Sequence, residues 1–194
     1  MSDVLLPKQI EQTTEVMAQN TYVAQNQFFG AVKEMSHSIT ILGDNNGNWQ
    51  QIELSKVYYN LFVIKDEIFD GWSGSFSILK RQALDYQALS DADKQTVLTF
   101  PSLFMDTNKA YRACANPGQQ FYYGKVDKIY EQGKCYKVYY QKISPARLLQ
   151  QDLAVHSVAL GININDGRDI MDETGWRIKK LDLRKALMNT GIYI

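Results

Sequence analysis

The chain has 194 residues, and its 21 basic and 21 acidic side chains give a formal net charge of zero. Apolar residues make up 45% and charged residues 22%, which are values of a globular protein, so the composition excludes collagen, mucin-like stalks, acidic tails and histone-like polycations. A chain of this length buries a core large enough to fold without disulfides or metal ions.

The sequence predicts a protein of the cytoplasm that is not associated with a membrane. It has no run of about 18 apolar residues, and its first residues, MSDVLLPKQIEQTTE, lack the basic and then apolar stretches of a secretory signal. Cys114 and Cys135 form no CxxC motif. We expect both to be reduced thiols, as is usual in cytoplasmic proteins.

Residues 7–42 are predicted to form one long helix. Two rows of apolar residues, each with a seven-residue repeat, produce an apolar seam on one face of this helix. The rows consist of Ile10, Met17, Ala24 and Ala31, and of Phe28, Met35 and Leu42. The seam packs either on the chain's own domain or on a second copy of itself, which would give a homodimer through residues 7–42.

A loop and a second helix are expected next. Gly, Asn and Asp at residues 43–48 are typical of a loop. Residues 52–69 have apolar spacings of three and four, which favour a helix. The run VYYNLFVI within them has the composition of a strand, so both interpretations remain open.

Two more helices complete the first half of the chain. Residues 75–89 carry apolar side chains on one side and are predicted to be helical. Ser90 is expected to cap a short helix with Asp91 and Asp93 in its first turn, where the helix dipole favours anions.

The clearest element is a β-hairpin over residues 121–143, FYYGKVDKIYEQGKCYKVYYQKI. Two aromatic and β-branched runs flank Gln132-Gly133, which is predicted to be a two-residue turn. This turn places Lys128 opposite Lys137, a like-charge pair that is unfavourable unless something offsets it.

Four elements are predicted after the hairpin, one of them a short strand over residues 161–165. A helix over residues 144–160 starts with Ser as its cap and Pro at its first position. Residues 176–179 alternate between apolar and basic and indicate a strand. Asp182 caps a last helix over residues 183–189, and Gly191 ends it.

The expected fold class is α+β. Residues 1–98 are predicted to form a helical bundle, and residues 99–194 a small, bent antiparallel sheet or partial barrel with flanking helices. The boundary between these two regions is placed just before Phe100-Pro101, since Pro101 makes the preceding residue extended.

The sequence carries no familiar enzyme motif. It has no GxSxG, Walker loop, GxGxxG, HExxH or HxH. The two histidines, His37 and His156, lie in predicted helices, and no cysteine or second histidine stands at the spacing of a zinc site. We therefore predict no cofactor.

An acidic cluster offers the best metal chemistry in the chain. It consists of Asp166, Asp169, Asp172 and Glu173. Carboxylates hold magnesium and organise phosphodiester cleavage, so this cluster would suit a metal-dependent phosphodiesterase or nuclease. The Glu-x-Lys pattern of restriction-type nucleases is not matched, because Gly175 follows Glu173 at that spacing. The alternative is a solvated loop beside a basic strand.

The hairpin carries the candidate binding residues. They are Lys125, Lys128, Tyr130, Lys137 and Tyr139, together with Arg177 and Lys179 of the later strand. Lysines contact phosphates and aromatic rings stack on bases, so this set suits single-stranded nucleic acid. The alternative is that the tyrosines cover a core and the lysines keep an exposed sheet edge soluble.

Three segments resemble a small α+β domain of poorly characterised bacterial proteins, some of them linked to antiviral defence or mobile elements. The segments are PSLF at 101–104, GKVDKI at 124–129 and TGWRIKKLDL at 174–183, and the resemblance covers residues 99–190. The family pattern places His where this chain has Gly175. The resemblance implies a bacterial protein and no established catalytic role.

We therefore expect a non-enzymatic binding or regulatory protein of the bacterial cytoplasm, associated with defence or mobile elements. Its partner is a protein or a single-stranded nucleic acid, contacted through the basic, tyrosine-rich hairpin. The alternative function is a metal-dependent phosphodiesterase or nuclease that uses the acidic cluster.

Overall fold

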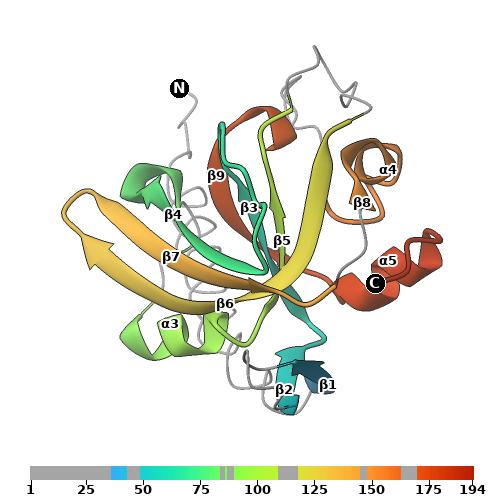
Figure 1. The fold of residues 1–194 in the computed structure, drawn as a ribbon, viewed down its shortest axis with the longest axis horizontal. Helices are drawn as coiled ribbons and strands as arrows, with labels where there is room; N and C mark the ends of the chain where they lie inside the picture. The colour runs from blue at the N-terminus through green and yellow to red at the C-terminus, as the bar shows by residue number, and fades with distance from the viewer. Residues whose placement is uncertain are drawn as a thin grey trace, which may run out of the picture.

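The computed structural model describes residues 36–42, 49–83, 86, 90–108, 118–144, 148–162 and 170–194, with side chains from residue 51 onwards (Figure 1). The strands are β1 (Ser36–Leu42), β2 (Trp49–Ser55), β3 (Tyr58–Val63), β4 (Ser73–Leu79), β5 (Pro101–Met105), β6 (Gln120–Gln132), β7 (Cys135–Lys142), β8 (Leu148–Leu149) and β9 (Gly175–Lys180). The α-helices are α3 (Asp91–Val97), α4 (Gln150–Val155) and α5 (Leu183–Asn189), and the 3-10 helices are η2 (Lys80–Gln82) and η3 (Ile170–Asp172).

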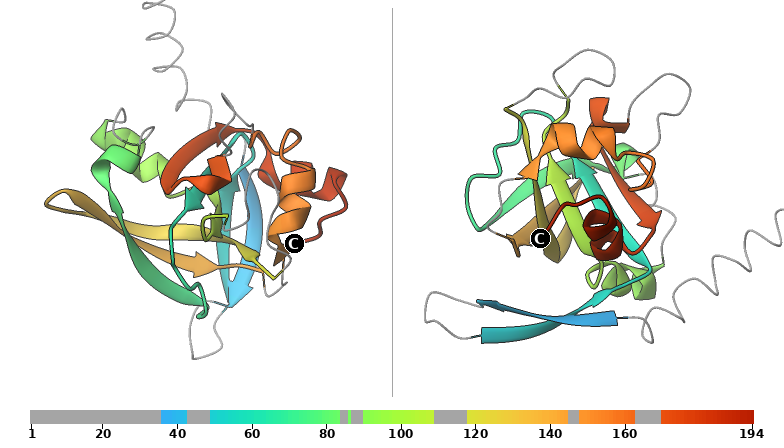
Figure 2. Two further views of the ribbon diagram at one scale, coloured as in Figure 1. Left: turned by 90° about the horizontal axis from the view of Figure 1, so that it is seen from above. Right: turned by 90° about the vertical axis from the view of Figure 1, so that its right-hand side faces the viewer.

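Seven of these strands form one mixed sheet. Its order is β4-β7-β6-β5-β3-β9, and β8 pairs with the beginning of β6. β3 and β5 run parallel, and the other neighbours are antiparallel. β1 and β2 form a separate hairpin (Figure 2). The large sheet combines β3 and β4, which precede residue 98, with strands that follow it.

One face of this sheet curls around an aromatic core, termed the inner cluster. Its members include Phe62 of β3, Phe76 of β4, Phe104 of β5, Val126 of β6, Val138 and Tyr140 of β7, and Trp176 of β9. The centroid of the Phe62 ring lies 5.3 Å from that of Phe76 and 5.0 Å from that of Trp176. These two partners stand on the opposite edge strands, so the sheet is strongly bent around Phe62 (Figure 2).

The other face of the central strands is covered by the C-terminal part of the chain. This outer cluster includes Leu61 of β3, Leu103 of β5, Phe121 of β6, Leu153 of α4 and Leu187 of α5. Every residue of β3 and β5 is buried as a result. Parallel strands are usually covered on both faces in this way.

The predicted N-terminal helical bundle is wrong. The structure has strands over residues 36–42, 49–55, 58–63 and 73–79. The last two belong to the seven-stranded sheet, which is mixed and not antiparallel as predicted. The spacings in 52–69 suggested a helix because β3 is buried on both faces, which produces a continuous apolar run instead of an alternating one.

Parts of the first-half predictions lie outside the described residues. The long helix was predicted from residue 7, and only residues 36–42 of it are described, where the backbone forms β1. Residues 1–35 and the predicted loop at 43–48 are not described. In the predicted helix over 75–89, residues 75–79 belong to β4 and residues 80–82 form η2, whereas residues 84, 85 and 87–89 lie outside the described part of the chain.

Several local predictions are confirmed. Ser90 Oγ accepts from the Asp93 amide at 3.3 Å, and the Asp93 carboxylate accepts from the Ser90 amide at 3.0 Å, which makes a capping box for α3. Asp182 Oδ1 accepts from the Lys185 amide at 3.0 Å at the start of α5. Gly191 follows α5 with φ 79°, a left-handed conformation that suits glycine.

The helix predicted over residues 144–160 is shorter than expected. The chain first adds β8 to the sheet and then forms α4 over Gln150–Val155. Residues 145–147 lie outside the described part of the chain. The predicted strand over 176–179 is confirmed as β9.

Replacing Phe62 by Ala tests the central role of this ring. Phe62 is 0% exposed and contacts rings from β4, β5 and β9. A Phe-to-Ala change in such a core is expected to lower the free energy of unfolding by about 3–5 kcal/mol, measured by urea titration. The control is Tyr193→Ala, at a residue that is 73% exposed. A loss for Phe62→Ala no larger than that of the control would contradict this role.

Stability is expected to fall in alkaline solution because of buried tyrosines. Burial raises the pKa of Tyr86 and Tyr140 from 10.0 to about 12, and also raises the pKa of Tyr59 and Tyr123. The unfolded chain therefore loses these protons at a lower pH than the folded chain does. The contribution of the neutral tyrosines to the free energy of unfolding is complete below pH 10.0 and is lost as the pH rises through the pKa values of the folded state.

The measurement is the urea midpoint as a function of pH. Lys142 acts in the opposite direction, because burial lowers its pKa below 10.5. It is one group against four tyrosines, so the midpoint should decrease above pH 10.0. A midpoint that is constant or that rises over this range contradicts the expectation.

Candidate functional site

The hairpin residues singled out in the sequence lie on the outer face of the sheet, which no helix of the described part of the chain covers at this point. Tyr136, Val138 and Tyr140 of β7 point into the inner cluster, so the residues between them point outward. The outward residues of β4, β7 and β6 form a polar surface termed the Tyr–Lys face. It consists of Ser75, Ser77, Lys137, Tyr139, Lys128 and Tyr130.

The register of the hairpin differs from the predicted one. Lys128 lies opposite Tyr139, and Tyr130 lies opposite Lys137, so the predicted Lys128–Lys137 pair is wrong. The turn is Gly133-Lys134 rather than Gln132-Gly133, and Gly133 has φ 56°, as the first residue of a type II′ turn requires.

A bulge between Val126 and Lys128 then shifts the pairing by one residue. Before the bulge, Val126 points into the inner cluster, and after it Lys128 and Tyr130 point outward. The turn therefore brings Lys128 and Lys137 each opposite a tyrosine, the bulge lets Val126 point inward on the same strand, and the like-charge repulsion expected from the sequence does not arise.

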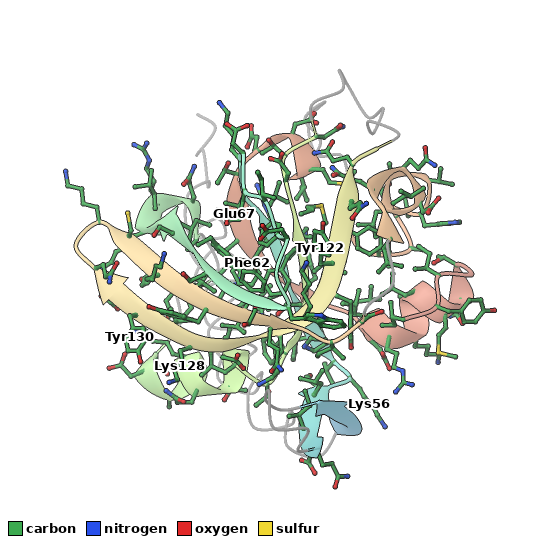
Figure 3. The ribbon with its side chains drawn as sticks, in the orientation of Figure 1. Lys56, Phe62, Glu67, Tyr122, Lys128 and Tyr130 are labelled. Carbon is green, nitrogen blue, oxygen red and sulfur yellow. The ribbon has the colours of Figure 1, made fainter. Side chains whose placement is uncertain are left out.

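The two tyrosines are the most accessible aromatic rings of the hairpin. Tyr130 is 51% exposed and Tyr139 is 40% exposed. Their centroids lie 5.8 Å apart at an interplanar angle of 87°, an edge-to-face arrangement. Figure 3 shows Tyr130 and Lys128 on the hairpin, distant from Phe62 in the core.

The lysines of the Tyr–Lys face remain available for a ligand. Among the described residues, no ion pair involves Lys128 or Lys137. Lys137 lies near enough to Glu67 to oppose the rise in pKa that burial causes at that carboxyl group. Lys125 differs, because its ammonium group forms an ion pair with Asp127 in the bulge.

The structure does not place Arg177 and Lys179 with the hairpin. Both lie on β9, opposite Leu61 and Tyr59 of β3, and β9 is separated from β6 by β3 and β5. Arg177 faces a cavity instead. Of the seven predicted residues, four therefore lie on the Tyr–Lys face, Lys125 lies beside the bulge of the same hairpin, and Arg177 and Lys179 lie on the opposite edge of the sheet.

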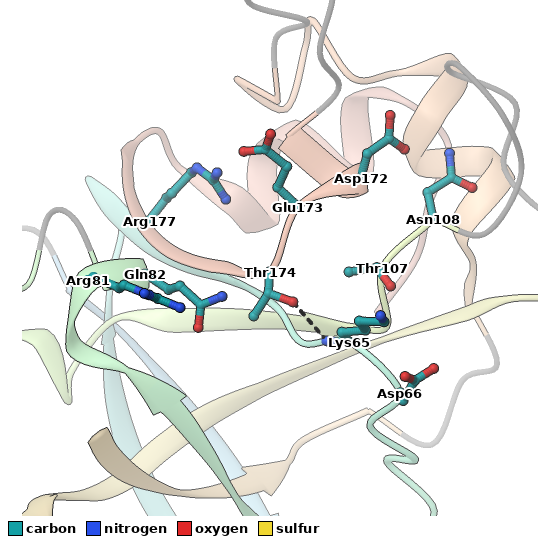
Figure 4. Close-up of a pocket in the computed structure, with 10 residues that line it drawn as sticks. All are labelled: Lys65, Asp66, Arg81, Gln82, Thr107, Asn108, Asp172, Glu173, Thr174 and Arg177. Carbon is teal, nitrogen blue, oxygen red and sulfur yellow. Dashed lines mark hydrogen bonds between the residues drawn. The ribbon is translucent and has the colours of Figure 1, made fainter. Parts of the chain in front are cut away.

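The cavity lies at the carboxyl ends of the parallel strands β3 and β5 and has a volume of about 810 Å³ (Figure 4). Lys65 and Asp66 follow β3, and Thr107 and Asn108 follow β5. The remaining walls come from Arg81 and Gln82 of η2, from Asp172 and Glu173, and from Thr174 and Arg177 at β9. Every side chain in this lining is charged, an amide or a hydroxyl.

The structure describes two of the four residues of the predicted acidic cluster. Asp172 and Glu173 line the cavity, whereas Asp166 and Asp169 lie outside the described residues. Within the described part of the chain, no three His, Cys, Asp or Glu residues come close enough to hold a metal ion. Asp172 and Glu173 share their cavity with the cations of Lys65, Arg81 and Arg177.

Sequence reasoning missed Lys65, Arg81 and Gln82. No local motif marks them, since Lys65 follows β3 and Arg81 and Gln82 follow β4, and these two strands are not neighbours in the sheet. The one available signal was the position of Lys65 directly after a long apolar run.

Comparisons with protein-family models, curated proteins and solved structures find no match to this chain. The resemblance over residues 99–190 therefore stays a prediction. No helix in the described part of the chain has the length and apolar character needed to cross a membrane.

Proposed function

We propose that this chain is a non-enzymatic binding protein that holds single-stranded nucleic acid on its Tyr–Lys face. The observation that carries the proposal is the alternation of two exposed tyrosine rings with two lysines across the β6–β7 pair. We further propose that it acts in the cytoplasm, in the bacterial defence or mobile-element systems that the resemblance over residues 99–190 implies.

The tyrosines supply surfaces for bases. Because Tyr130 meets Tyr139 edge to face, at least one broad ring surface stays open toward solvent. A base stacks on such a ring in a way that depends little on its identity. In a duplex the bases are already stacked on each other, so the Tyr–Lys face favours a single strand.

The lysines supply contacts to the phosphates that connect those bases. In each of the two cross-strand pairs a lysine stands beside a tyrosine, at the separation of about 5 Å between paired residues of neighbouring strands. A strand that stacks on either ring therefore runs past an ammonium group. Lys128 and Lys137 are not neutralised by ion pairs among the described residues.

The serines of β4 keep the surface beside the hairpin flat. Ser75 lies opposite Tyr139, and Ser77 lies opposite Lys137. Their short side chains leave room for a strand that crosses from β6 to β4. Their hydroxyl groups also donate hydrogen bonds, which phosphate and sugar oxygens accept.

The first prediction for this site concerns the two rings. Binding of fluorescent oligouridine and oligothymidine, about 12 nucleotides long, is measured by anisotropy. Replacing Tyr130 or Tyr139 by Ala is expected to weaken binding by about 5-fold to 150-fold, because one stacked base contributes about 1–3 kcal/mol. The matched controls Tyr130→Phe and Tyr139→Phe keep the rings and should keep the affinity.

A second prediction concerns the two lysines and salt. Each of Lys128→Ala and Lys137→Ala should weaken binding at low salt and reduce the slope of log affinity against log salt by about 0.7. Lys179→Ala on β9 is the matched control and should leave both values unchanged.

Three results would contradict the proposal. They are no binding at low salt, equal affinity for duplex and single strand, and Tyr-to-Ala variants that bind as the unchanged protein does. In the last case the Tyr–Lys face would be a surface for a protein partner or an exposed sheet face without a ligand.

A further inference from the structure

β4 forms one edge of the seven-stranded sheet, and this edge is open. β4 pairs with β7 alone, and Figure 1 shows β7 along one side of it only. Its seven residues pair with β7 without a bulge, and its sequence, SGSFSIL, holds neither proline nor a charged side chain. Proteins usually protect an edge strand with one of these features, because an open edge pairs with strands of other chains.

The ladder with β7 determines which backbone groups β4 presents at this edge. The Lys142 amide donates to the Trp72 carbonyl at 2.7 Å, and the Lys80 amide donates to the Lys134 carbonyl at 2.9 Å. Even-numbered residues of this segment therefore bond to β7, and odd-numbered residues direct their amide and carbonyl groups to the free edge. The odd-numbered residues of β4 are Ser73, Ser75, Ser77 and Leu79. No hydrogen bond joins these edge groups to another residue in the described part of the chain.

The opposite edge of the sheet is protected by charge. β9 has six residues, and it carries Arg177, Lys179 and Lys180. Charged side chains on an edge strand oppose pairing with another chain. The two edges of the sheet thus differ in character, and only β4 has the composition of a strand that accepts a further neighbour.

The open edge is accessible to solvent and begins beside an exposed aromatic ring. Ser73 and Ser77 are exposed. Trp72, directly before β4, is 61% exposed and belongs to neither the inner nor the outer cluster. Tryptophan is enriched in protein interfaces, where its ring is buried against the partner. Trp72 therefore marks one end of the β4 edge as a contact surface.

The charges beyond the ends of β4 fit a second copy of the chain in antiparallel orientation. Asp70 precedes the strand and Arg81 follows it, and both are exposed. Antiparallel pairing brings Asp70 of one copy toward the partner's Arg81 at both ends, whereas parallel pairing brings like charges together. The antiparallel pair also sets Trp72 opposite the partner's Lys80, which permits a cation–π contact.

We propose that β4 pairs with β4 of a second copy, antiparallel about a two-fold axis that passes at Phe76. This register aligns the whole of both strands and sets Ser75 opposite the partner's Ser77. Odd-numbered residues then face odd-numbered residues, so the edge amide and carbonyl groups of the two copies bond to each other. Because identical surfaces meet across a two-fold axis, the contact closes as a dimer and does not extend into a fibre.

The dimer is compatible with the Tyr–Lys face. The pairing uses the backbone edge of β4 and leaves the outward side chains of Ser75 and Ser77 in place, so the faces of both copies join on one side of a continuous sheet. Lys137 of one copy and the partner's Lys137 are then separated by three strand spacings, at least about 14 Å. This exceeds the Debye length of about 8 Å at physiological salt, so their repulsion is largely screened.

Sedimentation velocity of the full chain, without nucleic acid, tests the proposal. Pairing of one edge strand buries a small area, so we expect a reversible monomer–dimer equilibrium with a Kd of roughly 1–100 µM. The average mass should therefore rise from that of a monomer toward that of a dimer as the concentration increases from about 1 µM to about 500 µM.

Two pairs of variants test the edge itself. Ser77→Pro removes an amide that faces the free edge and not one that bonds to β7, so the monomer should keep its fold and the Kd should rise at least about tenfold. Ser77→Ala keeps this amide and should leave the Kd unchanged. If Ser77→Pro lowers the melting temperature, the exposed Trp72 serves instead. Trp72→Lys sets a cation opposite the partner's Lys80 and should also raise the Kd, whereas Trp72→Phe keeps a ring and should have a smaller effect.

A charge exchange tests the antiparallel orientation. Asp70→Arg should weaken the dimer at least about twofold, because it places like charges at both ends of the pair. The double variant Asp70→Arg/Arg81→Asp restores opposite charges and should recover the Kd of the unchanged chain. A double variant that is weaker still would contradict the proposed orientation.

Two further results would overturn the proposal. A monomer at about 500 µM would leave the β4 edge without a second copy as its occupant. A dimer that Ser77→Pro and Trp72→Lys do not weaken would form through another surface, such as the helix predicted over residues 7–42. Lys128→Ala on β6 should leave the dimer intact, so failure of the dimer and failure of nucleic-acid binding on the Tyr–Lys face are observed separately.

Discussion

The fold depends on β3, a strand that is buried on both faces. β3 contributes Phe62 to the inner cluster and Leu61 and Val63 to the outer cluster, and each of these side chains is 0% exposed. One face is covered because the sheet bends until both of its edge strands reach the Phe62 ring. The other face is covered by α4 and α5. Since those helices stop short of the β6–β7 hairpin, the outer face of the hairpin is left exposed, which is the origin of the Tyr–Lys face.

A single buried amide fixes how the strands meet around this core. Asn60 of β3 is 0% exposed, and its Nδ2 donates to the Val97 carbonyl and to Ser102 Oγ at 3.2 Å each. Its Oδ1 accepts from Trp176 Nε1 at 3.1 Å. The amide thus joins the end of α3, β5 and β9, and a register slip of β3 would leave it buried without partners, at a cost of about 1–3 kcal/mol per group. The same register aligns the strand ends that build the cavity.

The sequence predicted those elements whose signals are local. The capping residues Ser90 and Asp182 and the hairpin itself depend on chemistry within a few residues. The helical interpretation of 52–69 failed because two-sided burial removes the alternation that identifies a strand. The predicted partner of Lys128 was also wrong, since this pairing depends on whether the two-residue turn lies before or after Gly133. The cavity could not be predicted for a further reason. Its residues come together because of the order of the strands in the sheet, which a single sequence does not reveal.

Although the net charge of the chain is zero, folding produces a local excess of positive charge on the Tyr–Lys face. At the tip of the hairpin, Glu131 lies 2.7 Å from Lys80 and 3.3 Å from Lys94, and Asp127 pairs with Lys125 in the bulge. These partly exposed pairs at the protein surface add little stability, on the order of 1 kcal/mol or less each. They do engage the two acidic side chains of β6, so the lysines of the Tyr–Lys face are left without an ion pair among the described residues. A polyanion approaching within a Debye length, about 8 Å at physiological salt, therefore meets a positive surface on a neutral protein.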